Sequence, residues 1–462
     1  MARSFDVVVL GAGLAGHCAA LEAAEAGARV MLVDKAQQPG GSTLLSSGTF
    51  AFAATALQRE AGVEDSPERL RADLLKASGQ QADPSLLQLY VERQGETFEW
   101  LRGRGVEFLQ LALSSSMSVP RSHPTLPAQV MAALHERVRA EPRIDYRGQT
   151  QASRLLREGS RVVGFSWPDG RNEPAAAIVL ATGGFSRNPG LLARFAPRLS
   201  QALAVGGQAN VGEGHLMAWA LGADLVDMAW INGTFGMSLN RYPKRTLEPG
   251  DESILLLAIY RGAIAVNLKG ERFVDESRSY KQIGELCLDQ PSAVAFQVFD
   301  QKIMDQSVAA PTSNDYRSAL DKGLLRTAAS LEDLAAEVGL DPQTLRATVE
   351  RYNADLASAG ADSQFGRSSL GSGWGQPVLI DQAPFYIYPC TTGVLSTYCG
   401  LRVDRQMRVV DVYDEPIVGL YAAGEIVGGF HGAGYMSGSA LGKAAIFGRI
   451  AGRQAAALAH RR

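Results

Sequence analysis

Three glycines near the start of the chain have the spacing of a phosphate-binding turn. Gly11, Gly13 and Gly16 form the pattern GxGxxG, and Asp34 lies eighteen residues after Gly16. Such glycines allow a tight turn, a close approach of the backbone to a pyrophosphate, and close packing of the next helix. The helix N-terminus favours the anion, while the acid accepts hydrogen bonds from ribose hydroxyls. The residues predict a dinucleotide site, and they leave the choice between NAD and FAD open.

The elements needed to position this turn surround it. Residues 5–10 (FDVVVL) form a β-branched, apolar run that is typical of a buried parallel strand. Residues 17–28 are rich in alanine, which favours a helix, and residues 29–33 (RVMLV) form a second strand that ends at Asp34. We therefore expect a complete βαβ unit at this position.

The middle of the chain has a different organisation. Between about residues 228 and 396, short strands surround two helices, 330–338 and 341–357, with Asp341 as N-cap and Pro342 at the first helical position. Strands and a glycine-rich segment then return, followed by a helix over 443–459. We predict an α/β protein with a Rossmann-like, discontinuous dinucleotide-binding domain (1–228 and 397–462) and an inserted α+β capping, or substrate, domain (229–396).

Composition narrows the class of protein. The 462 residues carry 45 Lys and Arg against 48 Asp and Glu, a net charge of −3, which gives no basic surface for nucleic acid. The four cysteines lack metal-ligand spacing, so no metal is expected. No apolar run reaches the ~18 residues of a membrane span. The first strand leaves no room for a signal peptide, and we expect a cytoplasmic protein.

Several motifs occur in the order typical of one enzyme family. They are GAGLAG, PGGSTLLSSG, VLATGGF, GEGHLMAWALGADLVDM, GERFVDES, PFYIYP and GLYAAGEIVGGFHGAGYMSGSA. Together they resemble the FAD-containing family of fumarate reductase flavoprotein subunits, succinate dehydrogenase flavoproteins and 3-ketosteroid dehydrogenases, and they cover nearly the whole chain. The resemblance implies an FAD-dependent oxidoreductase that acts on CH–CH groups.

The resemblance also implies where FAD binds. The positions are Gly11, Gly13, Ala15, Gly16, Asp34, Lys35, Gly41, Ser42, Thr43, Ser47, Gly48, Ala152, Ala181, Thr182, Gly183, Glu213, Gly424, Glu425, Ala440 and Leu441. Glu425 is expected to bond ribityl or ribose hydroxyls, and the N–H groups of Ala440 and Leu441 to stabilise negative charge at the flavin pyrimidine. Glu213 stands where relatives usually carry Asp. No histidine lies near the GGST segment, so the FAD is expected to be non-covalent.

The residues that hold dicarboxylates in fumarate reductases are replaced here. Those enzymes use two histidines and an arginine as a clamp, and a second arginine as proton donor. The matching positions hold Thr234 or its neighbours, Leu395 and Ser396, Tyr435, and Tyr280. Two buried carboxylates would lack cationic partners, which argues against fumarate or succinate as substrate.

The two replacing tyrosines are similar to those of 3-ketosteroid dehydrogenases. The resemblance implies that Tyr280 abstracts the α-proton, and that Tyr435, with the N–H of Gly438 or Ser439, holds the ketone oxygen. The spacing after Tyr435 is one residue shorter than in the steroid enzymes, so both N–H donors stay open. The reference pKa of tyrosine is near 10. Arg278 and Lys281 flank Tyr280 and are able to favour its phenolate, or a proton relay serves instead.

Three further residues are candidates for substrate binding. Arg121 lies in SVPRSH, which resembles a segment of fumarate-reductase-like members, and it either meets a polar end of the substrate or belongs to a structural loop. Tyr386, in PFYIYP, either lines an aromatic pocket or packs in the core. Thr234 occupies one of the replaced clamp positions.

These observations favour a desaturase. We expect an FAD-dependent enzyme that introduces a C=C bond α,β to the carbonyl of a cyclic ketone, either a 3-ketosteroid or a smaller oxo-cyclohexane compound. The hydride passes to flavin N5 and the α-proton to Tyr280, and a quinone, a dye-like acceptor or oxygen takes the electrons. One alternative is an enone or enoate reductase of the fumarate reductase type, working in reverse. Another is a binding or escort protein without turnover.

Overall fold

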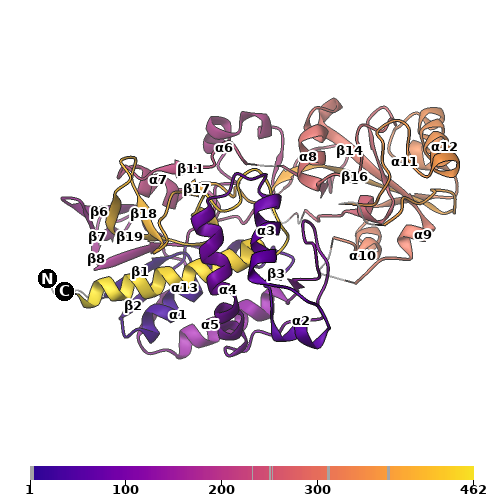
Figure 1. Cartoon of the computed structure of the whole chain (residues 1–462). Coiled ribbons are helices and arrows are strands. Elements are labelled where there is room, and N and C mark those ends of the chain that lie inside the picture. Colours follow the sequence, from indigo (N-terminus) through magenta and orange to yellow (C-terminus); the bar gives the residue numbers. More distant parts are fainter. Residues whose placement is uncertain are drawn as a thin grey trace. The chain divides into compact units, whose positions relative to one another are not determined.

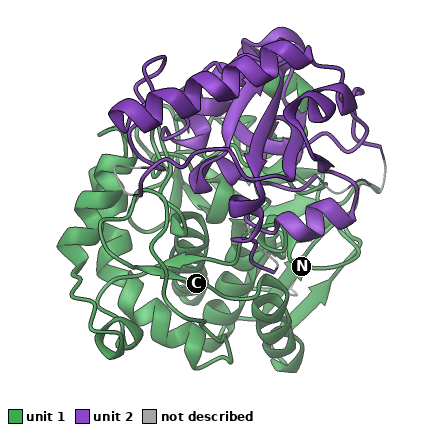
Figure 2. Cartoon of the chain, turned by 90° about the vertical axis from the view of Figure 1, so that its right-hand side faces the viewer, with its two compact units in different colours: residues 1–196, 206–231, 396–462 green, residues 197–205, 232–395 purple. Residues whose placement is uncertain are grey.

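The chain folds into two compact units. The computed structural model describes residues 5–231, 233–248, 251, 253–309, 313–371 and 375–461. The first unit comprises residues 1–196, 206–231 and 396–462, and the second comprises residues 197–205 and 232–395 (Figure 2). Each unit has its own sheet and its own core, so the two are described separately.

A nine-stranded sheet forms the centre of the first unit. Its order is β5 (Ile144–Arg147), β2 (Val30–Val33), β1 (Val7–Leu10), β9 (Ala177–Leu180), β19 (Pro416–Ala422), β7 (Arg161–Ser166) and β6 (Arg154–Glu158), with β18 (Arg408–Val410) on β19 and β8 (Asn172–Pro174) on β7. The strands from β5 to β7 along this order pair in parallel. All residues of β1, β2 and β9 are buried, as expected for parallel strands covered on both faces.

Two long helices of this unit pack closely. Helix α1 (Leu14–Glu25) follows β1, and α13 (Ser439–His460) lies beside it (Figure 1). A Cβ on Gly448 would lie 2.4 Å from the Ala15 carbonyl oxygen, and one on Gly452 would lie 2.1 Å from that of Ala19. Glycine at these two positions therefore lets the helix backbones approach.

Smaller elements complete the first unit. The helices are α2 (Ala56–Glu60), α3 (Pro67–Ala77), α4 (Pro84–Arg102), α5 (Pro127–Ala140), α6 (Pro189–Phe195) and α7 (Glu213–Trp219), with the 3₁₀ turns η1 (Gly41–Thr43) and η5 (Gly424–Ile426). Two short antiparallel pairs join β3 (Phe50–Ala51) to β4 (Ser122–His123) and β11 (Leu225–Val226) to β17 (Gly400–Leu401).

The second unit is an α+β arrangement around one long strand. Strand β16 (Phe385–Val394) pairs with β14 (Val294–Asp300), β12 (Thr234–Ser238), β15 (Arg326–Ala328) and β10 (Leu203–Ala204), and β13 (Ile264–Asn267) pairs with β14. The helices are α8 (Tyr280–Leu288), α9 (Gln301–Met304), α10 (Tyr316–Asp321), α11 (Leu331–Glu337) and α12 (Pro342–Ala359); η2 (Pro197–Leu199), η3 (Ala258–Arg261) and η4 (Pro291–Ala293) are 3₁₀ turns.

The structure confirms the α/β fold class, and the second unit has different bounds from the predicted inserted domain: it runs from residue 232 to 395 rather than from 229 to 396, and it also contains residues 197–205. Residues 197–205 belong to the second unit, because β10 pairs in parallel with β16. The predicted cap of α12 is confirmed: the Asp341 side chain accepts from the Thr344 N–H at 2.8 Å, and Pro342 begins the helix. A two-residue strand such as β10 carries too little pattern to reveal its unit in advance.

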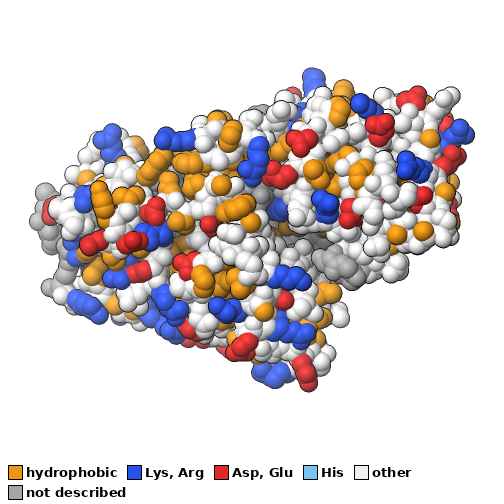
Figure 3. Space-filling view, turned by 45° about the horizontal axis from the view of Figure 1, so that its top comes forward, with side chains coloured by type: hydrophobic (Ala, Val, Ile, Leu, Met, Phe, Trp, Pro, Cys, Tyr) orange, Lys and Arg blue, Asp and Glu red, His pale blue; other side chains and the backbone are white. Residues whose placement is uncertain are grey.

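The surface agrees with the near-neutral net charge. On the face drawn in Figure 3, basic and acidic side chains are interspersed. Within the described ranges, no helix has both the length and the apolar character needed to cross a membrane.

Candidate active site

The glycine-rich turn after β1 contains glycines of two kinds. Gly11 has φ +107°, and its Cβ would lie 2.2 Å from the Ala181 carbonyl oxygen; a Cβ on Gly16 would lie 1.8 Å from that of Gly11. The packing of the chain therefore requires both. Gly13 has φ −78°, and its Cβ would approach nothing closer than the Gly40 carbonyl oxygen at 3.7 Å. Gly13 is also the N-cap of α1, where glycine is favoured, and its open backbone suits a pyrophosphate lying against it.

Asp34 is held beside the same turn. It follows β2, and its Oδ2 accepts from the Ala12 N–H at 2.6 Å while Oδ1 accepts from the Ala36 N–H at 2.7 Å. These bonds fix the carboxylate at the carboxyl end of the parallel strands, which is where ligands bind in open α/β sheets.

The half-buried Glu425 carboxylate links three distant segments of the first unit. Glu425 Oε1 accepts from the Thr397 N–H at 3.0 Å, and Oε2 accepts from Asn210 Nδ2 at 3.1 Å. The same Asn210 amide lies 3.0 Å from Ser42 Oγ. Burial raises the pKa of Glu425, while these hydrogen bonds and the Lys443 charge oppose the rise. Sequence reasoning missed Asn210 and Thr397, although Asn210 comes directly before the GEGHLMAW motif.

Two buried hydroxyls of the first unit, one just after β9 and one beside Glu425, indicate where a polar ligand could bind. Within the described residues, Thr182 Oγ1 and Thr397 Oγ1 have no hydrogen-bond partner. A Cβ on Gly184 would lie 2.4 Å from the Thr397 hydroxyl and 2.3 Å from Glu425 Oε1. Unpaired buried hydroxyls cost free energy, so these groups fit a ligand with many polar atoms. Together with Gly13, they show that the residues fit FAD.

The other positions expected for FAD also lie in the first unit. Lys35 forms an ion pair with Glu213, whose other oxygen accepts from Gln151 at 2.9 Å. Thr43 Oγ1 accepts from the Leu14 N–H at 3.2 Å, which joins η1 to the start of α1. The remaining positions are Ala15 in α1, Gly41 in η1, Ser47 and Gly48 before β3, Ala152 before β6, Ala181 and Gly183 after β9, Gly424 in η5, and Ala440 and Leu441 in the first turn of α13.

Tyr435 lies just before α13, with its hydroxyl turned back to the helix. Gly438, the N-cap, has φ +81°, and its N–H donates to the Tyr435 hydroxyl at 3.3 Å. Burial raises the pKa of Tyr435 to about 12, and the N–H groups of Gly438 and Ala440 oppose the rise. The Ser439 N–H instead donates to the Met436 carbonyl at 3.1 Å. Of the two N–H groups left open by the sequence, Gly438 is therefore the one beside the Tyr435 hydroxyl.

Two aromatic residues that sequence reasoning missed support Tyr435. Tyr398 stacks on it, with ring centroids 5.0 Å apart and planes 23° apart, and His431 lies 5.5 Å away. Tyr398 and His431 also contact each other at 4.9 Å. The signal was present in FHGAGY, where His431 precedes Tyr435 by four residues, but Tyr398 comes from a separate segment.

Tyr280 begins helix α8 in the second unit. Ser279 is the N-cap, and its hydroxyl accepts from the Lys281 N–H at 3.3 Å. The Tyr260 hydroxyl donates to the Arg278 carbonyl at 2.8 Å, which fixes the chain that enters the helix. Tyr280 itself is half-buried. The hydrogen bonds of Ser279 and Tyr260 therefore fix the backbone at the start of α8, where Tyr280 lies.

The neighbour of Tyr280 is a buried lysine. Lys281 is 7% exposed, its Nζ donates to Thr234 Oγ1 at 2.6 Å, and it lies 5.6 Å from the centroid of the Tyr280 ring. Burial lowers the pKa of Lys281 to about 7, and the charge of Glu285 opposes this change. The structure thus brings Thr234, which the sequence singled out separately, into contact with Lys281, the chain neighbour of Tyr280.

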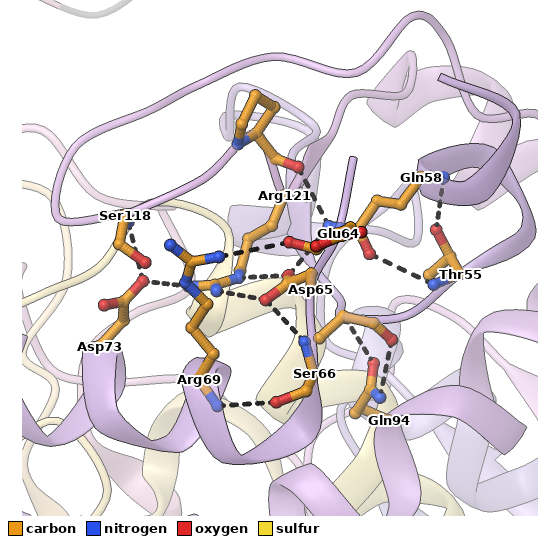
Figure 4. Close-up of polar contacts among 12 residues, drawn as sticks. Thr55, Gln58, Glu64, Asp65, Ser66, Arg69, Asp73, Gln94, Ser118 and Arg121 are labelled. Atoms are coloured by element: carbon orange, nitrogen blue, oxygen red, sulfur yellow. Dashed lines mark hydrogen bonds and ion pairs between the residues drawn. The ribbon is translucent and has the colours of Figure 1, made fainter. Parts of the chain in front are cut away.

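The structure gives Arg121 a different role from substrate binding. Its guanidinium is fully buried and pairs with Asp65 through Nε (2.9 Å) and Nη2 (2.7 Å), and with Asp73 through Nη1 (Figure 4). The Ser118 N–H also donates to Asp73, at 2.8 Å. The guanidinium is therefore committed to two carboxylates, and Arg121 joins its loop to α3 and the segment before it.

Tyr386 likewise belongs to the core. It is 6% exposed, its ring stacks on Phe299 at 5.4 Å, and its hydroxyl donates to Gln301 Oε1 at 2.7 Å. These contacts account for the ring and the hydroxyl, so we do not retain Tyr386 as a substrate-binding residue. Across the described ranges, no three His, Cys, Asp or Glu side chains gather as a metal site would require.

Comparison with known proteins places this site in a family. Residues 6–441 match the family model of the FAD binding domain. NADH:fumarate oxidoreductase of Klebsiella pneumoniae (strain 342) is 31% identical over 98% of this chain and 48% of that protein, so this chain spans about half of its length.

Two solved structures are similar over nearly the whole chain. The open conformation of a flavocytochrome c3 fumarate reductase has a TM-score of 0.86 and 30% identity, covering 99% of this chain and 79% of that one. The 3-ketosteroid-delta4-(5alpha)-dehydrogenase of Rhodococcus jostii RHA1, in complex with 4-androstene-3,17-dione, has a TM-score of 0.74 and 28% identity, covering 99% and 98%. The chain therefore belongs to the FAD binding domain family, as an FAD-dependent oxidoreductase of the fumarate reductase flavoprotein type.

Proposed function

We propose that this protein introduces a C=C bond α,β to the carbonyl of a cyclic ketone, either a 3-ketosteroid or a smaller oxo-cyclohexane compound. The observation that carries the proposal is the Tyr435 hydroxyl beside the Gly438 N–H at the first turn of α13. A tyrosine with a pKa of about 12 stays neutral at pH 7 and donates a hydrogen bond. Because the Gly438 N–H donates to the Tyr435 oxygen, the hydroxyl proton remains available for a ketone oxygen that gains negative charge in the transition state.

The loss of the dicarboxylate clamp supports a ketone over fumarate. The positions that hold cationic side chains in fumarate reductases carry Thr234, Leu395 and Ser396, Tyr435, and Tyr280. Arg121, the cation that the sequence suggested for substrate binding, pairs with Asp65 and Asp73 instead. A substrate carboxylate buried without such partners would be strongly disfavoured.

The roles of the residues follow from these environments. FAD, when bound, supplies the acceptor for the hydride that leaves the β-carbon. The Tyr435 hydroxyl, which accepts from the Gly438 N–H, donates to the carbonyl oxygen and polarises the carbonyl, which makes the α-hydrogen more acidic. Tyr280 takes that hydrogen as a proton, and the electron pair of the α C–H bond becomes the new π bond. The N–H groups of Ala440 and Leu441, in the first turn of α13, suit a cofactor that becomes more negative on reduction.

The reverse reaction is the second candidate. Similarity to NADH:fumarate oxidoreductase and to flavocytochrome c3 fumarate reductase favours a reductase of an enone or enoate, fed by a separate electron donor. The same residues serve in that direction, with Tyr280 as proton donor to the α-carbon. The redox partner decides the direction, since the chemistry at the two carbons is reversible.

The test is anaerobic reduction of the bound flavin. The FAD-loaded protein is mixed without oxygen with a saturated 3-ketosteroid, with cyclohexanone, and with succinate, and bleaching of the visible flavin band is followed. Bleaching by a ketone and not by succinate is the expected result, whereas bleaching by succinate alone contradicts it. If only the photoreduced protein reacts, and cyclohexenone reoxidises it, the reductase is correct. A protein that takes up no FAD would point to a binding role.

A further inference from the structure

Lys281 is unusual among the lysines described in the second unit because it is buried and has a defined neighbourhood. Its ammonium donates to the hydroxyl of Thr234, the first residue of β12, with an Nζ–Oγ1 distance of 2.6 Å. The same ammonium lies 5.6 Å from the centroid of the Tyr280 ring. An ammonium near an aromatic ring, in a site with little water, interacts strongly with charge on that ring. Lys281 is therefore placed to act on the ionisation of Tyr280.

Arg278 shows why the placement matters more than the charge. It precedes Tyr280 by two residues and has the same formal charge, but its side chain is exposed, and its backbone carbonyl accepts from Tyr260. Water and salt screen an exposed charge, so its effect on a neighbouring phenol is small. From the sequence alone, Arg278 and Lys281 are equal candidates for favouring the Tyr280 phenolate. Only Lys281 is buried, and this distinguishes the two.

We propose that Lys281, oriented by Thr234, is the positioning residue that favours the phenolate form of Tyr280, through the positive charge of its ammonium 5.6 Å from the Tyr280 ring centroid. This inference rests on the proposed function. Two protons are held at low pH, one on the Lys281 amine and one on the Tyr280 oxygen. The loss of one proton gives two forms in equilibrium, and in the reactive form the remaining proton is on the amine while the Tyr280 phenolate removes the α-proton of the ketone. The hydride goes to FAD, and the proton from the substrate stays on Tyr280.

The expected pH dependence follows from the pair as a whole. The pKa of Lys281, about 7, marks the loss of the first proton, so the rate rises with pH through about 7. Without the lysine, Tyr280 loses its proton nearer its ordinary value of about 10. The rise then shifts upward by about two to three pH units.

The other groups with raised pKa values on α8, on the strand β16 packed against it and at the Tyr280 N–H titrate outside this pH range. Burial raises the pKa of Tyr260, whose hydroxyl accepts from the Tyr280 N–H, well above its ordinary value. Cys287 on α8 has a pKa raised by burial to about 12, and burial raises the pKa values of Tyr388 and Cys390 on β16 well above their ordinary values. The charged groups are Glu285 on α8, which pairs with Arg198 of η2 at 2.7 Å and accepts from the Gly233 N–H at 3.2 Å, and Arg245, whose charge acts on Cys287.

The experiment compares the rate of anaerobic flavin reduction by a saturating ketone, from about pH 6 to about pH 10, in four proteins. These are the wild type, Lys281→Met, Thr234→Val and the matched control Arg278→Met. Lys281→Met is expected to react about a hundredfold more slowly at pH 7 and to approach the wild type near pH 10. Thr234→Val shifts the profile by less, and Arg278→Met keeps the rise near 7.

A second readout is independent of turnover. The near-ultraviolet absorbance of tyrosinate is titrated in FAD-loaded wild type and Lys281→Met, each corrected by the matching Tyr280→Phe protein. The Tyr280 signal is expected at higher pH without the lysine. A Lys281→Met rate profile that still rises near 7, an unchanged tyrosinate titration, or an equal shift in Arg278→Met overturns the inference. If no ketone reduces the flavin, the proposed function fails, and the tyrosinate titration still decides the role of Lys281.

Discussion

The two tyrosines assigned to the reaction lie in opposite kinds of surroundings. Tyr435 is stacked on Tyr398 and lies near His431, with the Gly438 N–H at its oxygen. Tyr280 begins a helix, and the ammonium of a buried lysine lies 5.6 Å from its ring centroid. Burial raises the pKa of Tyr435 to about 12, which favours a neutral hydroxyl. A nearby cation instead favours a phenolate.

The difference teaches how one residue type serves two purposes. A proton donor to a carbonyl must keep its proton at pH 7, and a base must be able to lose it. Enzymes assign acid and base roles by placing like groups in environments that move their pKa values apart. The cation, rather than the tyrosine itself, is thus the feature that separates the two assignments.

The strongest test of this comparison removes the assigned base. Tyr280→Phe is expected to lower kcat by about a thousandfold, since positioned acid–base groups typically contribute 10²–10⁴-fold. FAD content and the visible spectrum stay unchanged. Stopped-flow flavin reduction measures the effect. Tyr316→Phe is the control, because that hydroxyl contacts Asn314 in the core of the same unit. Near-normal turnover in Tyr280→Phe would remove Tyr280 from the mechanism.

Arg121 can be compared with Lys281, because both are buried cations but Arg121 has only a structural role. Arg121→Met leaves the buried carboxylates of Asp65 and Asp73 without their partner, and a loss of about 3–5 kcal/mol in the free energy of unfolding is expected. The kcat/KM for the ketone is expected to change by less than about twofold, since no substrate contact is lost. Denaturant unfolding and steady-state kinetics measure the two quantities.

The exposed neighbour Arg69 provides the control for that prediction. Arg69 lies on the surface near the ion pairs of Arg121, and its guanidinium donates to the Glu64 carbonyl oxygen over 3.3 Å (Figure 4). Arg69→Met is expected to cost less than about 1 kcal/mol. A large rise in KM for Arg121→Met, with unchanged stability, would return Arg121 to the substrate.

These residues also show what the sequence could reveal. The glycine turn, Asp34 and the α12 cap were predictable, because each depends on neighbours within a few residues or on a βαβ unit. Arg121 was not, because its partners lie 56 and 48 residues away and no local pattern marks them. Asn210 and Thr397 meet at Glu425 from separate segments for the same reason. Long-range pairing of polar groups leaves no periodic signal in the sequence.

A third test acts on the other tyrosine. Tyr435→Phe removes the hydroxyl beside the Gly438 N–H, and kcat with the ketone is expected to fall about a hundredfold, the usual cost of losing one donor to a developing oxyanion. The pH at which the rate rises stays near that of the wild type, because Tyr280 and Lys281 are intact. A shift of that pH by more than about one unit would show that Tyr435 titrates during the reaction and contradict its role as neutral donor.

The smallest effect is expected from the ring that supports Tyr435. Tyr398 stacks on it at 5.0 Å, and an aromatic pair contributes about 0.5–1.5 kcal/mol beyond its buried area. Tyr398→Leu is therefore expected to lower kcat/KM by about two- to tenfold, through a less ordered Tyr435 hydroxyl. Tyr398→Phe keeps the ring and is expected to retain nearly full activity. If both variants lost activity equally, the Tyr398 hydroxyl rather than the stacked ring would be the active feature, and the aromatic support of the neutral donor would be incorrect.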